Sequence, residues 1–227
     1  MIKPYYQDEW VTIYHGDCRE ILPELPNVDL ILTDPPYGVN LGNVDSGQER
    51  ERGQMGYENF EDTPEYLTSV IIPAFTLSLS KARRAIITPG NRNAMLYPHP
   101  DDIGVWYNPA GTGRGKWGFI LAHLIFYYGK DPHAGRCATA SSAWALNDSV
   151  ASIKNKTHPC PKPLLFTKWQ VSKGSLANEL ILDPFLGSGT TCVAAKHLNR
   201  YSIGIEIEER YCEVAAKRCS QSVMRLV

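Results

Sequence analysis

Short apolar runs alternate with helical patterns along this chain, and this alternation restricts its fold more than any other feature. The apolar runs are Val28–Thr33, Ala85–Thr88, Phe119–Leu121 with Leu124–Phe126, Leu180–Leu182 and Ser202–Ile207. Between them, apolar side chains recur at helical spacing in residues 64–79, 163–172, 190–198 and 208–224. Strands that alternate with helices predict an α/β fold. We expect a doubly wound, mostly parallel sheet with helices on both faces, in one domain that spans residues 1–227.

The composition is that of an ordinary globular protein. The chain has 227 residues, of which 43% are hydrophobic and 21% charged, and this is enough for one substantial core. No apolar run approaches the roughly 20 residues that a membrane span needs. Residues 1–7 lack the apolar core of a secretory signal. We therefore expect a cytoplasmic protein with no membrane partner.

The cysteine spacing argues against a metal enzyme, whereas the charge balance excludes no class of function. None of the six cysteines forms a C-x-x-C pair, so we expect reduced, structural thiols and no metal site. The formal net charge is −1. This value neither indicates nor excludes nucleic-acid binding, because a basic face can coexist with an acidic remainder.

Two stretches interrupt the alternation of strands and helices. Residues 38–63 are glycine-rich and polar, which predicts a mobile loop that contacts substrate, with a disordered insertion as the alternative. Residues 89–118 are rich in Pro, Gly, Asn and Trp, a composition typical of irregular surface structure. Neither stretch is large enough to fold as a second domain.

The run Val28–Thr33 ends in the tetrapeptide Asp34-Pro35-Pro36-Tyr37. Prolines cannot continue a strand, so a carboxylate and an aromatic ring meet in a turn where the strand ends. In doubly wound proteins, ligands bind outside the carboxyl ends of the strands. The tetrapeptide is therefore a candidate ligand-binding turn.

A second strand-like run, Leu180–Leu182, leads into the glycine-rich segment 183–191. A strand that passes through such a turn into a helix exposes backbone N–H groups to a ligand. The phosphate-binding P-loop is excluded because no lysine follows Gly189, and a dinucleotide fingerprint would need glycine in place of Cys192. We therefore expect a ligand without phosphates. Glu206, on the tip of the next strand, can accept hydrogen bonds from the diol of a ribose.

Together these motifs resemble the S-adenosylmethionine-dependent amino-methyltransferases that modify adenine or cytosine in nucleic acid. Asp34-Pro35-Pro36-Tyr37 resembles their catalytic motif, and the sequence D-P-F-x-G-S-G-T followed by G-I-E resembles their cofactor site. The segment His15-Gly16-Asp17-Cys18 and the element His158-Pro159-Cys160-Pro161-Lys162-Pro163 are similar to two further family motifs. The resemblance covers the chain from Gly16 to about Ala216 and implies a Rossmann-like methyltransferase fold.

The resemblance also implies roles for individual residues. The catalytic residues would be Asp34, Pro35, Pro36 and Tyr37. The cofactor, S-adenosylmethionine with S-adenosylhomocysteine as its product, would be bound by Asp17, Cys18, Asp34, His158, Lys162, Asp183, Pro184, Phe185, Gly187, Ser188, Gly189, Thr190, Glu206 and Ile207. No metal would take part.

The order of the motifs, catalytic turn first and cofactor turn last, is similar to the permuted β-type arrangement of the family. In that arrangement the intervening segment carries target recognition, which here means residues 89–157. Double-stranded DNA is the implied partner, in preference to RNA. A homodimer and a restriction endonuclease partner are further possibilities that the family suggests.

The reaction implied is methyl transfer to the exocyclic N6 of adenine in DNA. Asp34 and the Pro35 carbonyl would accept hydrogen bonds from the amino group, and Tyr37 would stack on the base. Asp at the head of the tetrapeptide favours adenine over the alternative, cytosine N4, whose enzymes more often have Ser there. A glutamine-modifying relative would have Asn at that position. A non-catalytic, cofactor-sensing nucleic-acid binder remains open, whereas a nucleotide-dependent oxidoreductase lacks the third glycine.

Overall fold

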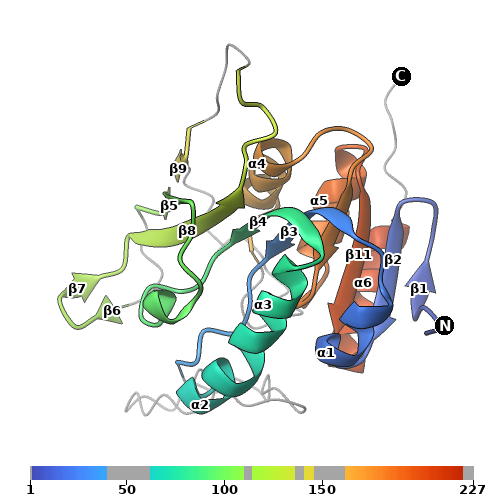
Figure 1. Cartoon of the computed structure of the whole chain (residues 1–227), viewed down its shortest axis with the longest axis horizontal. Helices are drawn as coiled ribbons and strands as arrows, with labels where there is room; N and C mark the ends of the chain where they lie inside the picture. The colour runs from blue at the N-terminus through green and yellow to red at the C-terminus, as the bar shows by residue number, and fades with distance from the viewer. Residues whose placement is uncertain (1, 40–61, 110–113, 136–140, 146–161, 222–227) are drawn as a thin grey trace.

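The computed structural model describes residues 2–39, 62–109, 114–135, 141–145 and 162–221 of the chain. These residues form one large sheet flanked by helices (Figure 1). The predicted loop 38–63 lies almost wholly outside the described residues, as does His158.

The strands and helices follow the predicted alternation. The strands are β1 Tyr6–Gln7, β2 Val11–His15, β3 Val28–Thr33, β4 Ala82–Ile87, β5 Asp102–Tyr107, β6 Arg114–Gly115, β7 Gly118–Phe119, β8 Ala122–Gly129, β9 Ala143–Ala145, β10 Leu180–Asp183 and β11 Tyr201–Glu206. The α-helices are α1 Cys18–Ile21, α2 Pro64–Tyr66, α3 Ile72–Leu79, α4 Leu164–Gly174, α5 Thr190–His197 and α6 Glu209–Ser220. Two short 3-10 helices, η1 Leu22–Glu24 and η3 Ala94–Leu96, and a π-helical stretch, η2 Leu67–Ile71, accompany them.

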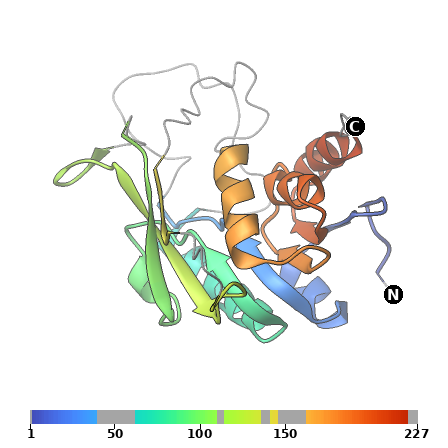
Figure 2. The same ribbon diagram turned by 90° about the horizontal axis from the view of Figure 1, so that it is seen from above.

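The large sheet has the strand order β1-β2-β11-β10-β3-β4-β8-β5-β9. Its centre, from β2 through β11, β10 and β3 to β4, is parallel throughout. Helices α4, α5 and α6 cover one face, and α1 and α3 cover the other (Figure 2). The predicted doubly wound, mostly parallel sheet is thereby confirmed.

Strand β3 shows why the central runs are apolar without alternation. Ile31 packs on the face covered by α1 and α3, whereas Leu30 and Leu32 pack on the face covered by α4. Because both faces of the strand are covered, every position between Asp29 and Thr33 has to be apolar. This burial fixes the strand whose carboxyl end carries Asp34.

The predicted helix 64–79 is a continuous but irregular helix. Thr63 caps its start, accepting a hydrogen bond from the N–H of Tyr66 at 3.1 Å. Its middle, Leu67–Ile71, is a π-helical stretch that ends two residues before Pro73. Proline has no N–H to donate and its ring crowds the carbonyl of the preceding turn, so the wider turn accommodates it.

The far edge of the sheet differs from the prediction. Residues 89–118 were expected to be irregular, but they contain β5, which pairs antiparallel with β8. Gly104 in the middle of β5 interrupts the run of apolar side chains from which a strand is predicted. A Cβ there would lie 2.0 Å from the carbonyl oxygen of Ser142, so the glycine is what lets β9 pair with this strand.

The topology places one crevice at the carboxyl ends of β3 and β10. From β3 the chain crosses over α3 to β4, and from β10 it crosses over α5, on the opposite face, to β11. The two crossovers therefore diverge from neighbouring strands, which creates a switch point. Ligands of doubly wound sheets bind at such a point. No described helix is long and apolar enough to cross a membrane.

Replacing Leu30 by alanine tests the account of the core. Leu30 is 0% exposed, so Leu30→Ala should lower the free energy of unfolding by about 2–5 kcal/mol, because the cavity cannot close fully. Leu77 on α3 is 37% exposed and serves as the control, with an expected loss below about 1 kcal/mol. Urea denaturation of the two variants measures both values. Equal losses would contradict the buried position of β3.

Candidate active site

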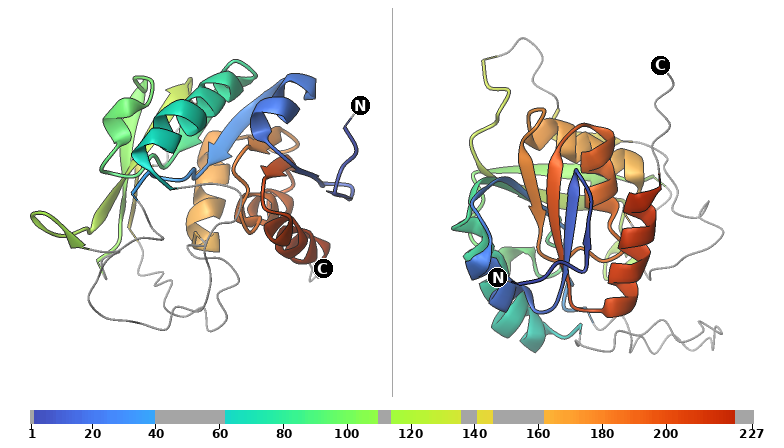
Figure 3. Two further views of the ribbon diagram at one scale, coloured as in Figure 1. Left: turned by 90° about the horizontal axis from the view of Figure 1, so that it is seen from below. Right: turned by 90° about the vertical axis from the view of Figure 1, so that its right-hand side faces the viewer.

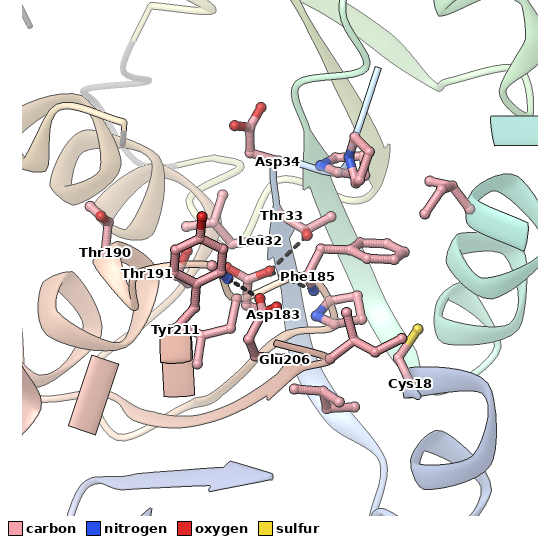
Figure 4. Close-up of a pocket in the computed structure, with 18 of the residues that line it drawn as sticks. Cys18, Leu32, Thr33, Asp34, Asp183, Phe185, Thr190, Thr191, Glu206 and Tyr211 are labelled. Carbon is pink, nitrogen blue, oxygen red and sulfur yellow. Dashed lines mark hydrogen bonds between the residues drawn. The ribbon is translucent and has the colours of Figure 1, made fainter. Parts of the chain in front are cut away.

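A cavity opens at the switch point and is lined by both predicted motifs. The turn after β3 contributes Asp34, Pro35, Pro36 and Tyr37 to its wall, and the turn after β10 contributes residues 183–188. Glu206 and Ile207, at the end of β11, and Asp17 and Cys18, after β2, complete the side toward α1. The carboxyl ends of neighbouring parallel strands thus bring together segments that are far apart in the sequence (Figure 4).

A buried carboxylate joins the two turns. Asp183, at the end of β10, is 3% exposed and accepts a hydrogen bond from the hydroxyl of Thr33 at 2.7 Å. It also accepts bonds from the N–H of Phe185 at 3.2 Å and from the hydroxyl of Thr191. Burial raises the pKa of Asp183 to about 6, although these bonds work in the opposite direction,.

The glycine turn is shaped by Glu206 on the adjacent strand. One carboxylate oxygen of Glu206 accepts from the N–H of Gly187 at 2.6 Å, and the other accepts from the N–H of Glu208 at 2.9 Å. Burial is the main cause that raises the pKa of Glu206 to about 7, and the charges of Glu208 and Asp183 act in the same direction. Each oxygen keeps a second lone pair with which to accept from a ligand.

The last part of the glycine turn is structural. Gly189 has φ +82°, and a Cβ on it would lie 2.7 Å from the Cβ of Ala215 on α6. Glycine is therefore required there both for the backbone conformation and for the approach of α6. Arg218 on α6 donates to the carbonyl of Ser188 at 2.5 Å, to its hydroxyl at 2.9 Å and to the hydroxyl of Thr190 at 3.2 Å. These hydrogen bonds fix the glycine turn to α6.

The Asp34 carboxylate lies at the centre of a polar network. One oxygen accepts from the hydroxyls of Tyr37 and Thr88, each at 2.5 Å. The other lies 2.5 Å from the ammonium nitrogen of Lys162. That nitrogen also donates to the Tyr37 hydroxyl at 2.9 Å and lies 5.2 Å from the centre of the Tyr37 ring. An amino nitrogen thus sits against both Asp34 and the aromatic ring.

The loop after β4 positions the tetrapeptide. The side-chain amide of Asn93 donates to the carbonyls of Tyr37 at 2.8 Å and Gly38 at 3.2 Å. Gly90, with φ +71°, packs so closely that a Cβ on it would lie 2.7 Å from the Tyr37 ring. Burial and the charge of Asp34 raise the pKa of Tyr37, so its hydroxyl stays protonated and donates.

Asp17 lies on the opposite wall of the cavity at the start of α1. Its carboxylate caps the helix, accepting from the N–H of Arg19 at 2.8 Å, and pairs with the Arg19 guanidinium at 2.5 Å. The hydrogen bonds from Arg19 are the main cause that lowers the pKa of Asp17. Cys18 is buried beside it with a free thiol.

The structure brings most of the predicted site residues to one cavity. Asp17, Cys18, Lys162, Glu206 and Ile207 line it together with the tetrapeptide Asp34–Tyr37 and residues 183–188 and 190. Gly189 does not line the cavity, and His158 lies outside the described residues. No group of three or more His, Cys, Asp or Glu side chains suited to a metal occurs among the described residues.

The residues that support the two turns were not among the predicted site residues. Thr33 and Thr88 are each a polar residue at the end of an apolar run, and that pattern on neighbouring strands could have shown that both face the same edge. No sequence signal marks Gly90 or Asn93. Gln170 on α4 was also missed, although it is buried against the cavity, and its amide nitrogen has no hydrogen-bond partner.

Comparison with known proteins agrees with this geometry. A family model described as DNA methylase (N6_N4_Mtase) matches residues 126–217. The type II methyltransferase M.HinfI of Haemophilus influenzae is 29% identical over an alignment that covers 96% of this chain and 70% of the relative.

Two solved structures share the fold. The crystal structure of the M1.HpyAVI–SAM complex has a TM-score of 0.68 at 22% identity, covering 92% of this chain and 99% of that chain. The PvuII DNA methyltransferase (cytosine-N4-specific) has a TM-score of 0.71 at 16% identity, covering 98% of this chain and 91% of that chain. With the matches in sequence, these likenesses lead to one conclusion. The chain is similar in sequence to DNA methyltransferases of the N6/N4 family and is similar in fold to the two solved structures.

Proposed function

We propose that this DNA methyltransferase transfers the methyl group of S-adenosylmethionine to the N6 amino group of adenine in double-stranded DNA. The observation that carries the proposal is the position of Asp34. Its carboxylate stands at the carboxyl end of β3, in a rigid turn, on the wall of the cavity that Gly187 and Glu206 also line.

The cavity suits a cofactor with a positive charge and without phosphates. The charge of Asp34 raises the pKa of Asp183, and the charge of Asp183 raises the pKa of Glu206, so a sulfonium cation among these groups would relieve the repulsion. Glu206 and Asp17 line this cavity and would hold the ribose and the adenine, and Gln170 offers an unpaired amide N–H. When bound, the cofactor supplies a methyl group activated by the sulfonium.

Asp34 and Pro35 would activate the target nitrogen. The lone pair of an exocyclic amine is delocalised into the base, which makes the nitrogen a poor nucleophile. If Asp34 and the Pro35 carbonyl each accept one of its hydrogen bonds, the nitrogen becomes more tetrahedral and its lone pair is localised. Because the turn is fixed by prolines, these acceptors are already in position when the base arrives.

The Lys162 ammonium lies where the target amine would bind under this proposal. It donates to an Asp34 oxygen and lies beside the Tyr37 ring. The amino group of the base would use the same oxygen. Entry of the base therefore requires Lys162 to move aside. The Tyr37 ring, backed by Gly90, then stacks on the base, which has first to leave the duplex.

Adenine is preferred because Asp heads the catalytic tetrapeptide. Cytosine N4 is the alternative target, and its amino group would use the same acceptors. Residues 89–157 are proposed to carry target recognition and residues 38–63 to close over the substrate. A homodimer and a restriction endonuclease partner belong to the same proposal.

Analysis of the methylated nucleosides tests the proposed function. Genomic DNA from a strain without methyltransferases is incubated with the protein and isotope-labelled S-adenosylmethionine, digested and resolved by mass spectrometry. The label should appear in N6-methyldeoxyadenosine. Label in N4-methyldeoxycytidine would contradict the choice of adenine, and no label at all would contradict the enzyme.

A matched pair of variants makes this test specific to Asp34. Asp34→Asn should lower the rate at least about 100-fold, because the ionised acceptor is lost, while the affinity for S-adenosylhomocysteine stays close to that of the wild type. Asp29 lies on the same strand, at the end away from the cavity, where it accepts from Leu180. Asp29→Asn should retain activity. Full activity of Asp34→Asn would remove Asp34 from the mechanism.

The raised pKa of Glu206 predicts that cofactor affinity depends on pH. Ribose hydroxyls donate best to the ionised carboxylate, whose pKa in the free protein is about 7. Binding should therefore release a proton below that pH, and the affinity should increase from about pH 6 to about pH 8 and then level off. Calorimetry with S-adenosylhomocysteine measures this. Glu206→Gln should bind more weakly and show no such change, and a flat wild-type profile would contradict the role.

A further inference from the structure

A small hairpin outside the cavity presents large apolar side chains to solvent. Strands β6 and β7 pair with each other in a sheet of their own, through Arg114 with Phe119 and Gly115 with Gly118. The turn between them is Lys116-Trp117. Trp117 is 103% exposed and Phe119 is 77% exposed. Aromatic side chains placed like this add nothing to the core, and their grouping on a surface marks an interaction site.

The hairpin projects from the edge of the sheet that carries Asp34. It connects the end of β5 to the start of β8 (Figures 1 and 3). Because β8 runs antiparallel to β4, with Phe126 opposite Ile87, the start of β8 lies at the carboxyl ends of β3 and β4. The side-chain amide of Asn91, in the loop after β4, donates to the carbonyl of Ala122 at 2.6 Å and accepts from the N–H of Leu124 at 3.1 Å. The base of the hairpin is thereby fixed to the catalytic edge.

The charge around the hairpin favours a polyanion. From Ile103 to Tyr128 the sequence contains no Asp or Glu, and its two Lys and Arg residues, Arg114 and Lys116, both belong to the hairpin. Lys116 is exposed beside Trp117 at the tip. Cations at this position can pair with phosphates.

We propose that the β6–β7 hairpin is a DNA wedge in which Lys116 pairs with a phosphate and Trp117 stacks on a base next to the target. The inference rests on the proposed function, because it needs a duplex whose target base occupies the cavity. Removing a base from the stack costs free energy, and an apolar side chain that enters the gap offsets part of that cost. The indole would thus hold open the position that the target base has left.

A second copy of this chain is the other partner that an exposed aromatic pair could bind. The cations beside Trp117 and the position of the hairpin at the catalytic edge favour DNA instead. A contact between two copies through this hairpin would bring the exposed Lys116 of each copy together, and their like charges would repel. The oligomeric state of the variants therefore belongs to the test.

Substitution of Trp117 tests the wedge. With sheared genomic DNA as substrate, Trp117→Ala should lower kcat/KM for DNA at least about tenfold, because base stacking on the side chain is lost. Trp117→Phe should stay within about threefold of the wild type, since it keeps an aromatic face. Ile103→Ala is the control, because Ile103 is 47% exposed at the far end of β5; it should retain activity. The affinity for S-adenosylhomocysteine should be unchanged in all three variants.

Tryptophan fluorescence provides a readout that does not depend on methyl transfer. Duplex DNA should quench the emission of the wild-type protein, and the quenching should be much smaller in Trp117→Phe. If the wild type methylates nothing but this quenching is seen, the proposed function fails, whereas the contact of Trp117 with DNA is supported. If Trp117→Ala keeps its kcat/KM for DNA within about twofold, or changes the protein from dimer to monomer in light scattering, the wedge is wrong, whatever base is methylated.

Discussion

The hydrogen bond from Thr33 to Asp183 connects the two halves of the site. Thr33 is the last residue of β3 and directly precedes Asp34, whereas Asp183 ends β10 and opens the glycine turn. Both side chains are buried, so the carboxylate can give up water only because the hydroxyls of Thr33 and Thr191 and the N–H of Phe185 replace it,. The register of two neighbouring parallel strands therefore sets the position of the Asp34–Tyr37 turn relative to the glycine turn that follows β10.

The arrangement concentrates acidic groups where the sheet has its switch point. Asp34 directly follows β3, and Asp183 and Glu206 end the adjacent strands β10 and β11. The charge of Asp34 raises the pKa of Asp183, and the charge of Asp183 raises that of Glu206,. Lys162 partly compensates them in the free protein by pairing with Asp34. A cationic ligand and an amino group that donates hydrogen bonds can both use the same acidic cavity. An overall net charge of −1 is therefore compatible with the proposed reaction on DNA, because acidic groups gather in the cavity while Lys116 is exposed on the β6–β7 hairpin.

The central sheet and the residues that line the cavity were predicted from the sequence, whereas the residues that position the Asp34–Tyr37 turn were not. The runs ending at Thr33, Asp183 and Glu206 were recognised because strands buried on both faces are apolar throughout. β5 was missed because Gly104, which the approach of Ser142 requires, interrupts its pattern. The supports of the catalytic turn, Gly90 and Asn93, act through a close backbone approach and through bonds to carbonyls. Such contacts depend on tertiary structure and leave no periodic signal.

Thr33→Val tests most directly whether the two turns form one site. Valine keeps the shape of threonine and removes the hydroxyl that donates to Asp183. We predict that the affinity for S-adenosylhomocysteine and the rate of methyl transfer at saturating cofactor both fall, each by about tenfold, because a buried carboxylate loses a partner. Thr88→Val, which removes a donor to Asp34 alone, should lower the rate and leave that affinity unchanged. A Thr33→Val protein that changes in only one of the two measurements would contradict the account.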